Sequence, residues 1–150
     1  MNKLMRVFLS LVFILLIGLD DFSQSNVKID PLYLGITLID QPNVEKMVGL
    51  CKYYELNEMP DQDGFKVFRH SNGTEFRFKV DKDGERNLPV VIVETNEKDK
   101  TVDYFLSNVG YVKEGKDFVK GTKLEQRRTR CKVTGRTHKT LTFEKEYNNL

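Results

Sequence analysis

The sequence predicts an α+β protein in which two helices lie on one face of a mainly antiparallel sheet of six to eight strands. Three observations predict this class. The 150-residue chain contains no alanine, the best helix former, but ten phenylalanines and six tyrosines, which are common in strands. Several segments alternate apolar and polar residues with the period of a strand. Two other segments repeat apolar residues with the period of a helix.

The first 25 residues have the composition of a secretory signal peptide. A short basic start precedes the apolar segment 7–19, and Ser25 is a small residue suited to cleavage. The apolar segment is shorter than the roughly 20 residues that cross a membrane, although an uncleaved anchor is the alternative. The sequence therefore predicts a signal peptide over 1–25 and a single domain over 26–150. We expect a secreted or periplasmic protein with no stable transmembrane insertion after signal cleavage.

The domain begins with a predicted strand and a predicted helix. Residues 32–38 place leucine or isoleucine at every second position, which is typical of a strand. Pro42 interrupts this pattern, and a proline near a capping residue is a helix start signal. The segment 44–51 then has apolar residues at i, i+3, i+4 and i+7, which predicts a helix with one apolar face.

A hairpin is predicted over residues 65–80. Asn72 and Gly73 lie between two alternating segments, and this dipeptide suits a two-residue type I′ turn. With such a turn, the numbers of cross-strand partners sum to 145, so Val67 pairs with Phe78. The apolar side chains of both strands then share one face.

The second part of the chain repeats the pattern of the first. Residues 89–93 predict a short strand buried on both faces, and 102–109 predict a helix that ends at Gly110. The apolar residues of this helix follow those of the first helix by a constant 58 positions. We therefore expect two β-α-β-β units, over 30–84 and 88–147. A duplication, or two similar solutions to one packing problem, would produce them.

Tandem units of helix on sheet resemble the layout of the secreted β-lactamase inhibitor proteins. The resemblance concerns layout, and no motif accompanies it. It transfers neither a target nor site residues to this sequence.

The chain contains two cysteines, Cys51 and Cys131. An even pair in a protein that enters an oxidising compartment predicts one disulfide, and two buried free thiols are the alternative. A metal site built from both cysteines with His70 and His138 lacks the short paired spacings of zinc motifs. We therefore expect no metal and no cofactor.

The last third of the chain is strongly basic. Residues 120–140 include eight basic residues and one acidic residue. A strand in this segment directs Arg128, Arg130 and Lys132 to one face as a row, and Arg136 follows in the same segment. This row predicts a binding site for a protein or for an anionic component of the cell envelope. An ordinary solvated strand face is the alternative interpretation.

The sequence offers little for catalysis or for nucleic-acid binding. It contains no Gly-x-Ser-x-Gly, His-Glu-x-x-His or phosphate-loop motif, and no aromatic residues interleave the basic segment for base stacking. We expect an exported, non-catalytic binding or protein-interaction module, such as an inhibitor or assembly factor, that uses an exposed basic sheet face. The alternatives are a binder of a small ligand or anionic glycan, with a pocket between helices and sheet, and a small hydrolase of unrecognised type.

Overall fold

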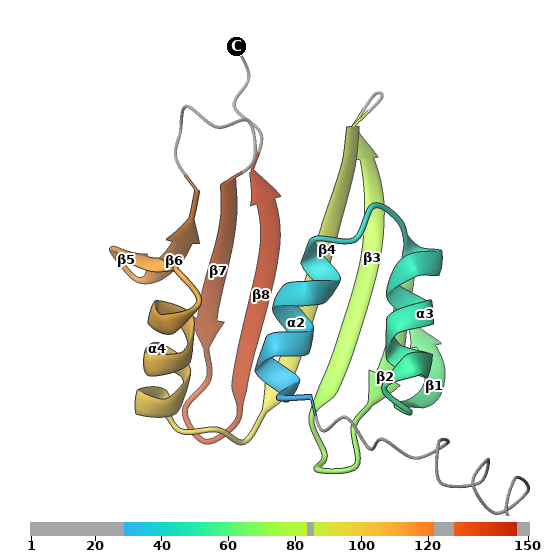
Figure 1. Cartoon of the computed structure of the whole chain (residues 1–150), viewed down its shortest axis with the longest axis horizontal. Coiled ribbons are helices and arrows are strands. Elements are labelled where there is room, and N and C mark those ends of the chain that lie inside the picture. The colour runs from blue at the N-terminus through green and yellow to red at the C-terminus, as the bar shows by residue number, and fades with distance from the viewer. Residues whose placement is uncertain (1–28, 84–85, 122–127, 147–150) are drawn as a thin grey trace, which may run out of the picture.

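The computed structural model describes residues 29–83, 86–121 and 128–146 (Figure 1). The predicted signal peptide and its cleavage site lie outside the described residues. In the described part of the chain, one eight-stranded antiparallel sheet and three helices confirm the α+β class, with one helix more than expected. The helices are α2 (Pro31–Ile39), α3 (Val44–Tyr53) and α4 (Asp99–Asn108). The strands are β1 (Asn57–Gln62), β2 (Phe65–Arg69), β3 (Glu75–Asp83), β4 (Arg86–Thr95), β5 (Val112–Glu114), β6 (Asp117–Lys120), β7 (Arg128–Thr134) and β8 (Lys139–Glu146).

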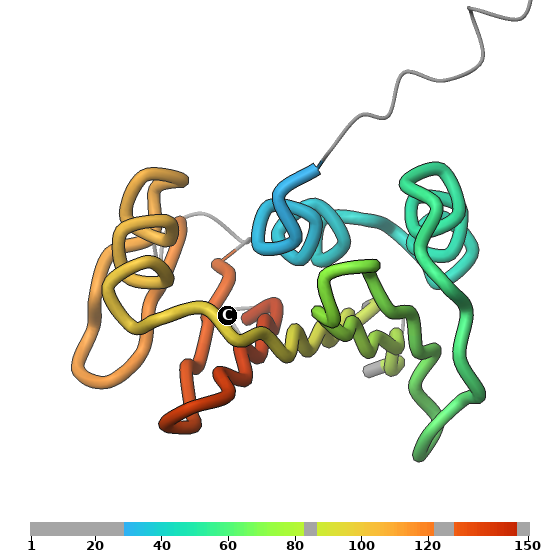
Figure 2. The backbone as a smooth tube through the Cα atoms, turned by 90° about the horizontal axis from the view of Figure 1, so that it is seen from below, coloured from blue at the N-terminus to red at the C-terminus, as the bar shows by residue number. Residues whose placement is uncertain are grey.

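The three helices lie on the same side of the sheet (Figures 1 and 2). The strand order is β1-β2-β3-β4-β8-β7-β6-β5, so β4 and β8 are the two central strands. α2 contacts β4 and β8, α3 contacts β3, and α4 contacts β5. Among the described residues no helix or strand lies over the opposite side, which we call the uncovered face. Each strand therefore directs alternate side chains into the core and onto the uncovered face.

Two halves with the same layout meet at the centre of the sheet. α3 is followed by β1 to β4, and α4 is followed by β5 to β8. The structure thus corrects the order of elements within the predicted units, because each repeat is one helix followed by four strands. The two halves join through the antiparallel pairing of β4 with β8.

The helix ends show the repeat most clearly. The N–H of Leu56 donates to the carbonyl of Cys51, and the N–H of Tyr111 donates to the carbonyl of Leu106, each at 2.9 Å. Corresponding residues in these two bonds are 55 positions apart, not the 58 that the apolar stripes predicted. The same six-residue closing bond ends both helices, with a left-handed residue between its partners in each case.

Residues 31–39 form a helix and not the predicted strand. The side chain of Asp30 accepts a hydrogen bond from the N–H of Leu32 at 2.8 Å, and Pro31 occupies the first turn. The alternating leucines belong to a nearly continuous apolar segment, in which most residues are buried. Such a segment is equally compatible with a helix that is buried on several sides. The buried residues of α2 are Leu32, Leu34, Gly35, Ile36, Leu38 and Ile39.

The hairpin of β2 and β3 is shifted by one residue from the predicted register. The N–H of His70 donates to the carbonyl of Thr74 at 2.8 Å, which leaves a three-residue loop that ends at Gly73 with a φ of 90°. Val67 consequently pairs with Arg77. Three-residue loops with a left-handed final residue are a common alternative to the two-residue turn. This register buries three phenylalanines on the helix side: Phe68, Phe76 and Phe78.

Other predicted elements are present. The predicted helices at 44–51 and 102–109 correspond to α3 and α4. The predicted strand at 89–93 lies within β4, but only its helix side is fully buried, because none of the described helices covers the other face. α4 buries Val102 and Leu106. No helix in the described ranges combines the length and the apolar character needed to span a membrane.

Gly35 allows α2 to approach the centre of the sheet. A Cβ atom at this position would lie 2.6 Å from Cγ2 of Val93 on β4 and 3.4 Å from Cε2 of Phe143 on β8. Gly49 of α3 offers a matched control, because a Cβ atom there would meet nothing within 4 Å.

We predict that Gly35→Ala lowers the free energy of unfolding by about 1–3 kcal/mol, because the helix must move away from the sheet. Gly49→Ala should instead raise it by roughly 0.5–1 kcal/mol, since alanine is the better residue in mid-helix. Urea unfolding measures both values. Equal or greater stability of Gly35→Ala would contradict the close approach.

Candidate functional site

The uncovered face has an apolar strip at its centre. Val91 and Val93 of β4 are buried on the helix side, so Leu88, Val90 and Ile92 face the other way, and these three are only half-buried. Ile92 pairs with Thr142 of β8 on the same face. On this face β4 therefore presents an apolar strip, and β8 places Thr142 beside Ile92 and Glu144 beside Val90.

Ion pairs border the strip on the β3 side. Arg69 binds Glu75 at 2.7 Å, and Arg77 binds Glu94. The Nε of Arg77 also lies 3.8 Å from Glu75, which links the four side chains into one network. The charges on this side of the face are therefore balanced.

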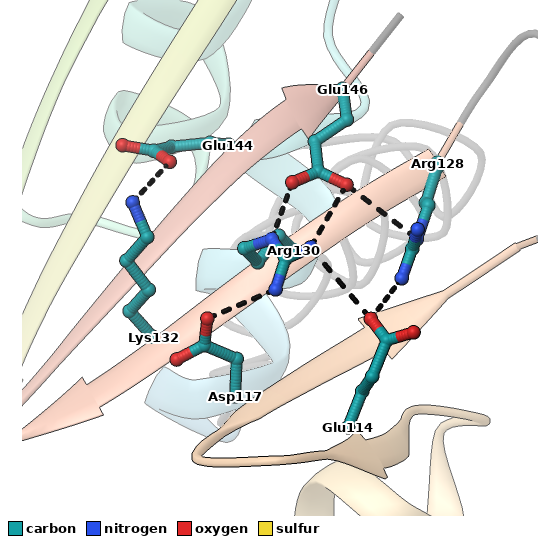
Figure 3. Close-up of polar contacts among 7 residues, drawn as sticks. All are labelled: Glu114, Asp117, Arg128, Arg130, Lys132, Glu144 and Glu146. Carbon is teal, nitrogen blue, oxygen red and sulfur yellow. Dashed lines mark hydrogen bonds and ion pairs between the residues drawn. The ribbon is translucent and has the colours of Figure 1, made fainter. Parts of the chain in front are cut away.

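A second network borders the strip on the β7 side (Figure 3). We call it the arginine–carboxylate cluster, and it consists of Glu114, Asp117, Arg128, Arg130 and Glu146. Arg130 binds Glu146, lies 3.0 Å from Asp117 and 3.7 Å from Glu114. Arg128 binds Glu114 and lies 3.5 Å from Glu146. The hydrogen bonds from Arg130 to Glu146 and Asp117 raise the pKa of its guanidinium above the ordinary value.

The structure places the predicted basic row on the uncovered face, but it does not leave the row free. Arg128 and Arg130 belong to the cluster, and Lys132 binds Glu144 at 2.9 Å. Arg136 lies in the turn after β7, where it is exposed, so it does not extend the row. The three strand positions are therefore neutralised cations rather than an open basic surface.

The carboxylates that neutralise the row are candidate site residues that the sequence analysis missed. Glu114 and Asp117 come from β5 and β6, and Glu144 and Glu146 come from β8. The β8 residues alternate with the buried Leu141 and Phe143, and they share a hairpin with the basic row. That alternation indicates that Glu144 and Glu146 face away from the core. The contribution of β5 and β6 depends on sheet order, which the pattern did not determine.

Beneath the central helix, buried side chains pack directly against the sheet. Leu34 and Leu38 of α2 are completely buried, and Gly35 lies against Val93. Two open hollows occur at the ends of the sheet, one of about 470 Å³ beside the ion pair of Asp40 with Lys145 and one of about 320 Å³ beside His138. The larger hollow is lined by the end of α2 and by residues of β4 and β8, so it lies between a helix end and the sheet.

The histidines have local partners. The Nδ1 of His70 accepts a hydrogen bond from the N–H of Asn72 at 3.2 Å, and the Nδ1 of His138 contacts Asn96. Within the described ranges, no group of three or more histidine, cysteine, aspartate or glutamate side chains is arranged to hold a metal ion. Neither histidine therefore belongs to a metal-holding group among these residues.

Cys51 and Cys131 are separate buried thiols, which corrects the predicted disulfide. Cys51 lies on α3, which contacts β3, whereas Cys131 lies on β7. Two strands separate β3 from β7, so their axes are about 14 Å apart at about 4.8 Å per strand. A disulfide needs Cα atoms within roughly 7 Å. Burial raises the pKa of the Cys51 thiol to about 12, and burial likewise raises the pKa of Cys131.

No family model, curated protein or solved structure matches this chain. The fold alone does not define a function. The functional argument therefore rests on the uncovered face and its two charge networks.

We predict that native protein resists iodoacetamide at pH 9, because both thiols are inaccessible and remain protonated well above that pH. Unfolding in guanidinium without a reductant should expose both thiols and add two labels per chain. Mass spectrometry of the intact chain counts the labels. If the unfolded chain takes up label only after reduction, the two cysteines are bridged and their assignment as free thiols is wrong.

Proposed function

We propose that this protein is an exported, non-catalytic interaction module that binds another protein through the uncovered face of its sheet. One observation carries the proposal: the apolar strip formed by Leu88, Val90 and Ile92 lies between two networks of ion pairs. Protein interfaces commonly combine an apolar centre with a polar rim. Export is supported by the signal-peptide composition of residues 1–25.

The size of the uncovered face suits a protein partner. Eight strands at about 4.8 Å spacing span about 34 Å, and five residues per strand extend about 17 Å. The flat area of the face is therefore on the order of 600 Å², and protruding side chains add to its accessible surface. One partner in a standard interface contributes about 800 Å². The face therefore approaches the area that a specific complex requires.

Charged side chains of the face are paired with one another. The contacts between Arg69 and Glu75 and between Lys132 and Glu144 measure 2.7 and 2.9 Å. A side chain that is held before binding loses less conformational entropy in the complex. These networks therefore favour a face that meets a folded partner without rearrangement.

Other classes of ligand have weaker support. A polyanion requires available cations, whereas the cations of the predicted row are paired with carboxylates. A small ligand requires an enclosed pocket, and the described hollows are open. A hydrolase with a covalent nucleophile requires that nucleophile and a base within reach of each other. The buried thiols and the two histidines, which bond to Asn72 and Asn96, do not provide this arrangement.

Affinity capture with matched variants tests the proposal. The double variant Val90→Thr plus Ile92→Thr removes apolar surface from the strip and keeps β-branched residues in the strand. The control is Tyr33→Ser, because Tyr33 is 52% exposed on α2, on the opposite side of the sheet. We expect the parent and the control to retain the same partner, and the double variant to bind it at least tenfold more weakly, about 1.4 kcal/mol.

Urea unfolding must first show that both variants are folded. Retention of the partner by the folded double variant with unchanged affinity would contradict the proposal. Loss of the partner through Tyr33→Ser alone would also contradict it, because that result would place the interface on the helix side.

A further inference from the structure

We infer that the partner contacts the β5–β8 half of the uncovered face with a basic surface, whose lysine or arginine side chains bind the arginine–carboxylate cluster. The inference rests on the proposed function, and it names the charge of the partner. It also reverses the sign that the basic row predicted. The argument concerns which charges the cluster exposes, which atoms it leaves available, and what lies beside it.

The carboxylates of the cluster are more exposed than its arginines. The side chains of Arg128 and Arg130 are 10% and 23% exposed, whereas those of Glu114 and Glu146 are 52% and 33% exposed. Asp117, at 28%, is also more exposed than either arginine. Three carboxylates surround two guanidinium groups, so the cluster carries one net negative charge. A larger fraction of each carboxylate than of either arginine is therefore exposed, and the net charge of the cluster is negative.

The available hydrogen-bonding atoms are acceptors. Oε2 of Glu114 and Oδ2 of Asp117 receive the arginines, while the second oxygen of each carboxylate points away from them (Figure 3). An ionised carboxylate has about four lone-pair sites, so two contacts leave it able to accept more. Arg130 directs its donors to the carboxylates of its own chain. A cationic donor from a partner therefore finds acceptors here, and an anion does not find comparable donors.

An apolar contact lies beside these acceptors. Val112 of β5 is 70% exposed and pairs with Val119, which pairs with Arg130, so these residues share the uncovered face. Lysine and arginine side chains combine an apolar stem with a charged end. An exposed valine next to a carboxylate matches both parts of such a side chain. This arrangement favours a protein surface over a simple inorganic cation.

Two lysines lie close to the cluster, and one of them supplies a variant for the test. Lys132 is 47% exposed but is neutralised by Glu144. Lys116 is exposed in the turn between β5 and β6, directly after the strand that carries Glu114. Removing the Lys116 charge makes this part of the face more acidic, so it should strengthen the binding of a basic probe. Glu45, exposed on α3, supplies a carboxylate on the opposite side of the sheet.

The experiment titrates the isotopically labelled full chain with a blocked peptide that alternates arginine and glycine. Backbone NMR signals of β5 to β8 should shift, and the affinity should fall as salt rises from 50 to 300 mM, since screening weakens the attraction. Glu114→Gln should weaken binding about threefold and Glu114→Lys at least tenfold. Glu45→Gln, with the same change of charge, should leave the affinity unchanged, and Lys116→Gln should increase it.

The spectrum of each variant without peptide shows whether the fold is retained. Binding that is unaffected by Glu114→Lys would overturn the inference, as would stronger binding of a matched glutamate–glycine peptide to the same strands. Neither result would contradict the proposed function, which is tested by the double variant of Val90 and Ile92. Suppose that the variant Val90→Thr plus Ile92→Thr loses the captured partner, while Glu114→Lys binds the peptide with unchanged affinity. The proposed binding face would then stand, and the inference of a basic partner would be wrong.

Discussion

The contact of α2 with the paired strands β4 and β8 is the constraint on which the rest of the structure depends. These strands join the two repeats, and Gly35 brings the helix against Val93 from one repeat and Phe143 from the other. A helix held this closely at the centre leaves room for α3 and α4 only at its sides, where they cover the outer strands (Figure 2). All three helices of the described chain thus pack against one side of the sheet, and the other side is the uncovered face.

On the uncovered face, charged side chains lie over apolar ones. Val67 faces this side between Met59 and Arg77 and is nevertheless completely buried. Val119 occupies the corresponding place beside Arg130 and is 6% exposed. The apolar stems of arginine can cover such residues while the guanidinium groups hold carboxylates above them. Both halves thus pair a valine with an arginine that binds carboxylates, which explains why the row of basic residues is not an open basic surface.

Much of the fold was predictable, because local patterns determine it. The apolar stripes of α3 and α4 and the short apolar run in β4 each depend on one segment of the chain. The conformation of residues 31–39 was not predictable from alternation, since burial on several sides removes the difference between helical and strand patterns. The hairpin register depended on whether its loop contains two residues or three, and Asn72-Gly73 is compatible with both.

The site was harder to predict than the fold. The sequence correctly directed Arg128, Arg130 and Lys132 to one face, but it could not supply their partners. Glu114 and Asp117 reach the arginines because β6 pairs with β7 and β5 pairs with β6, and this is a property of sheet order. The same non-local arrangement separates Cys51 from Cys131. Compartment and cysteine count favoured a disulfide, but the distance between two strands decided against it.

The division between a structural covered side and a binding uncovered face is tested most directly by carboxyl footprinting of the captured complex. Carbodiimide labelling, read by peptide mass spectrometry, compares the reactivity of each carboxylate in the free and bound chain. We predict that Glu94, Glu144 and Glu146 become protected, while Glu45 on α3 and Asp103 on α4 keep their reactivity. Protection of Glu45 or Asp103, with unchanged labelling of the three residues on β4 and β8, would contradict a binding role for the uncovered face.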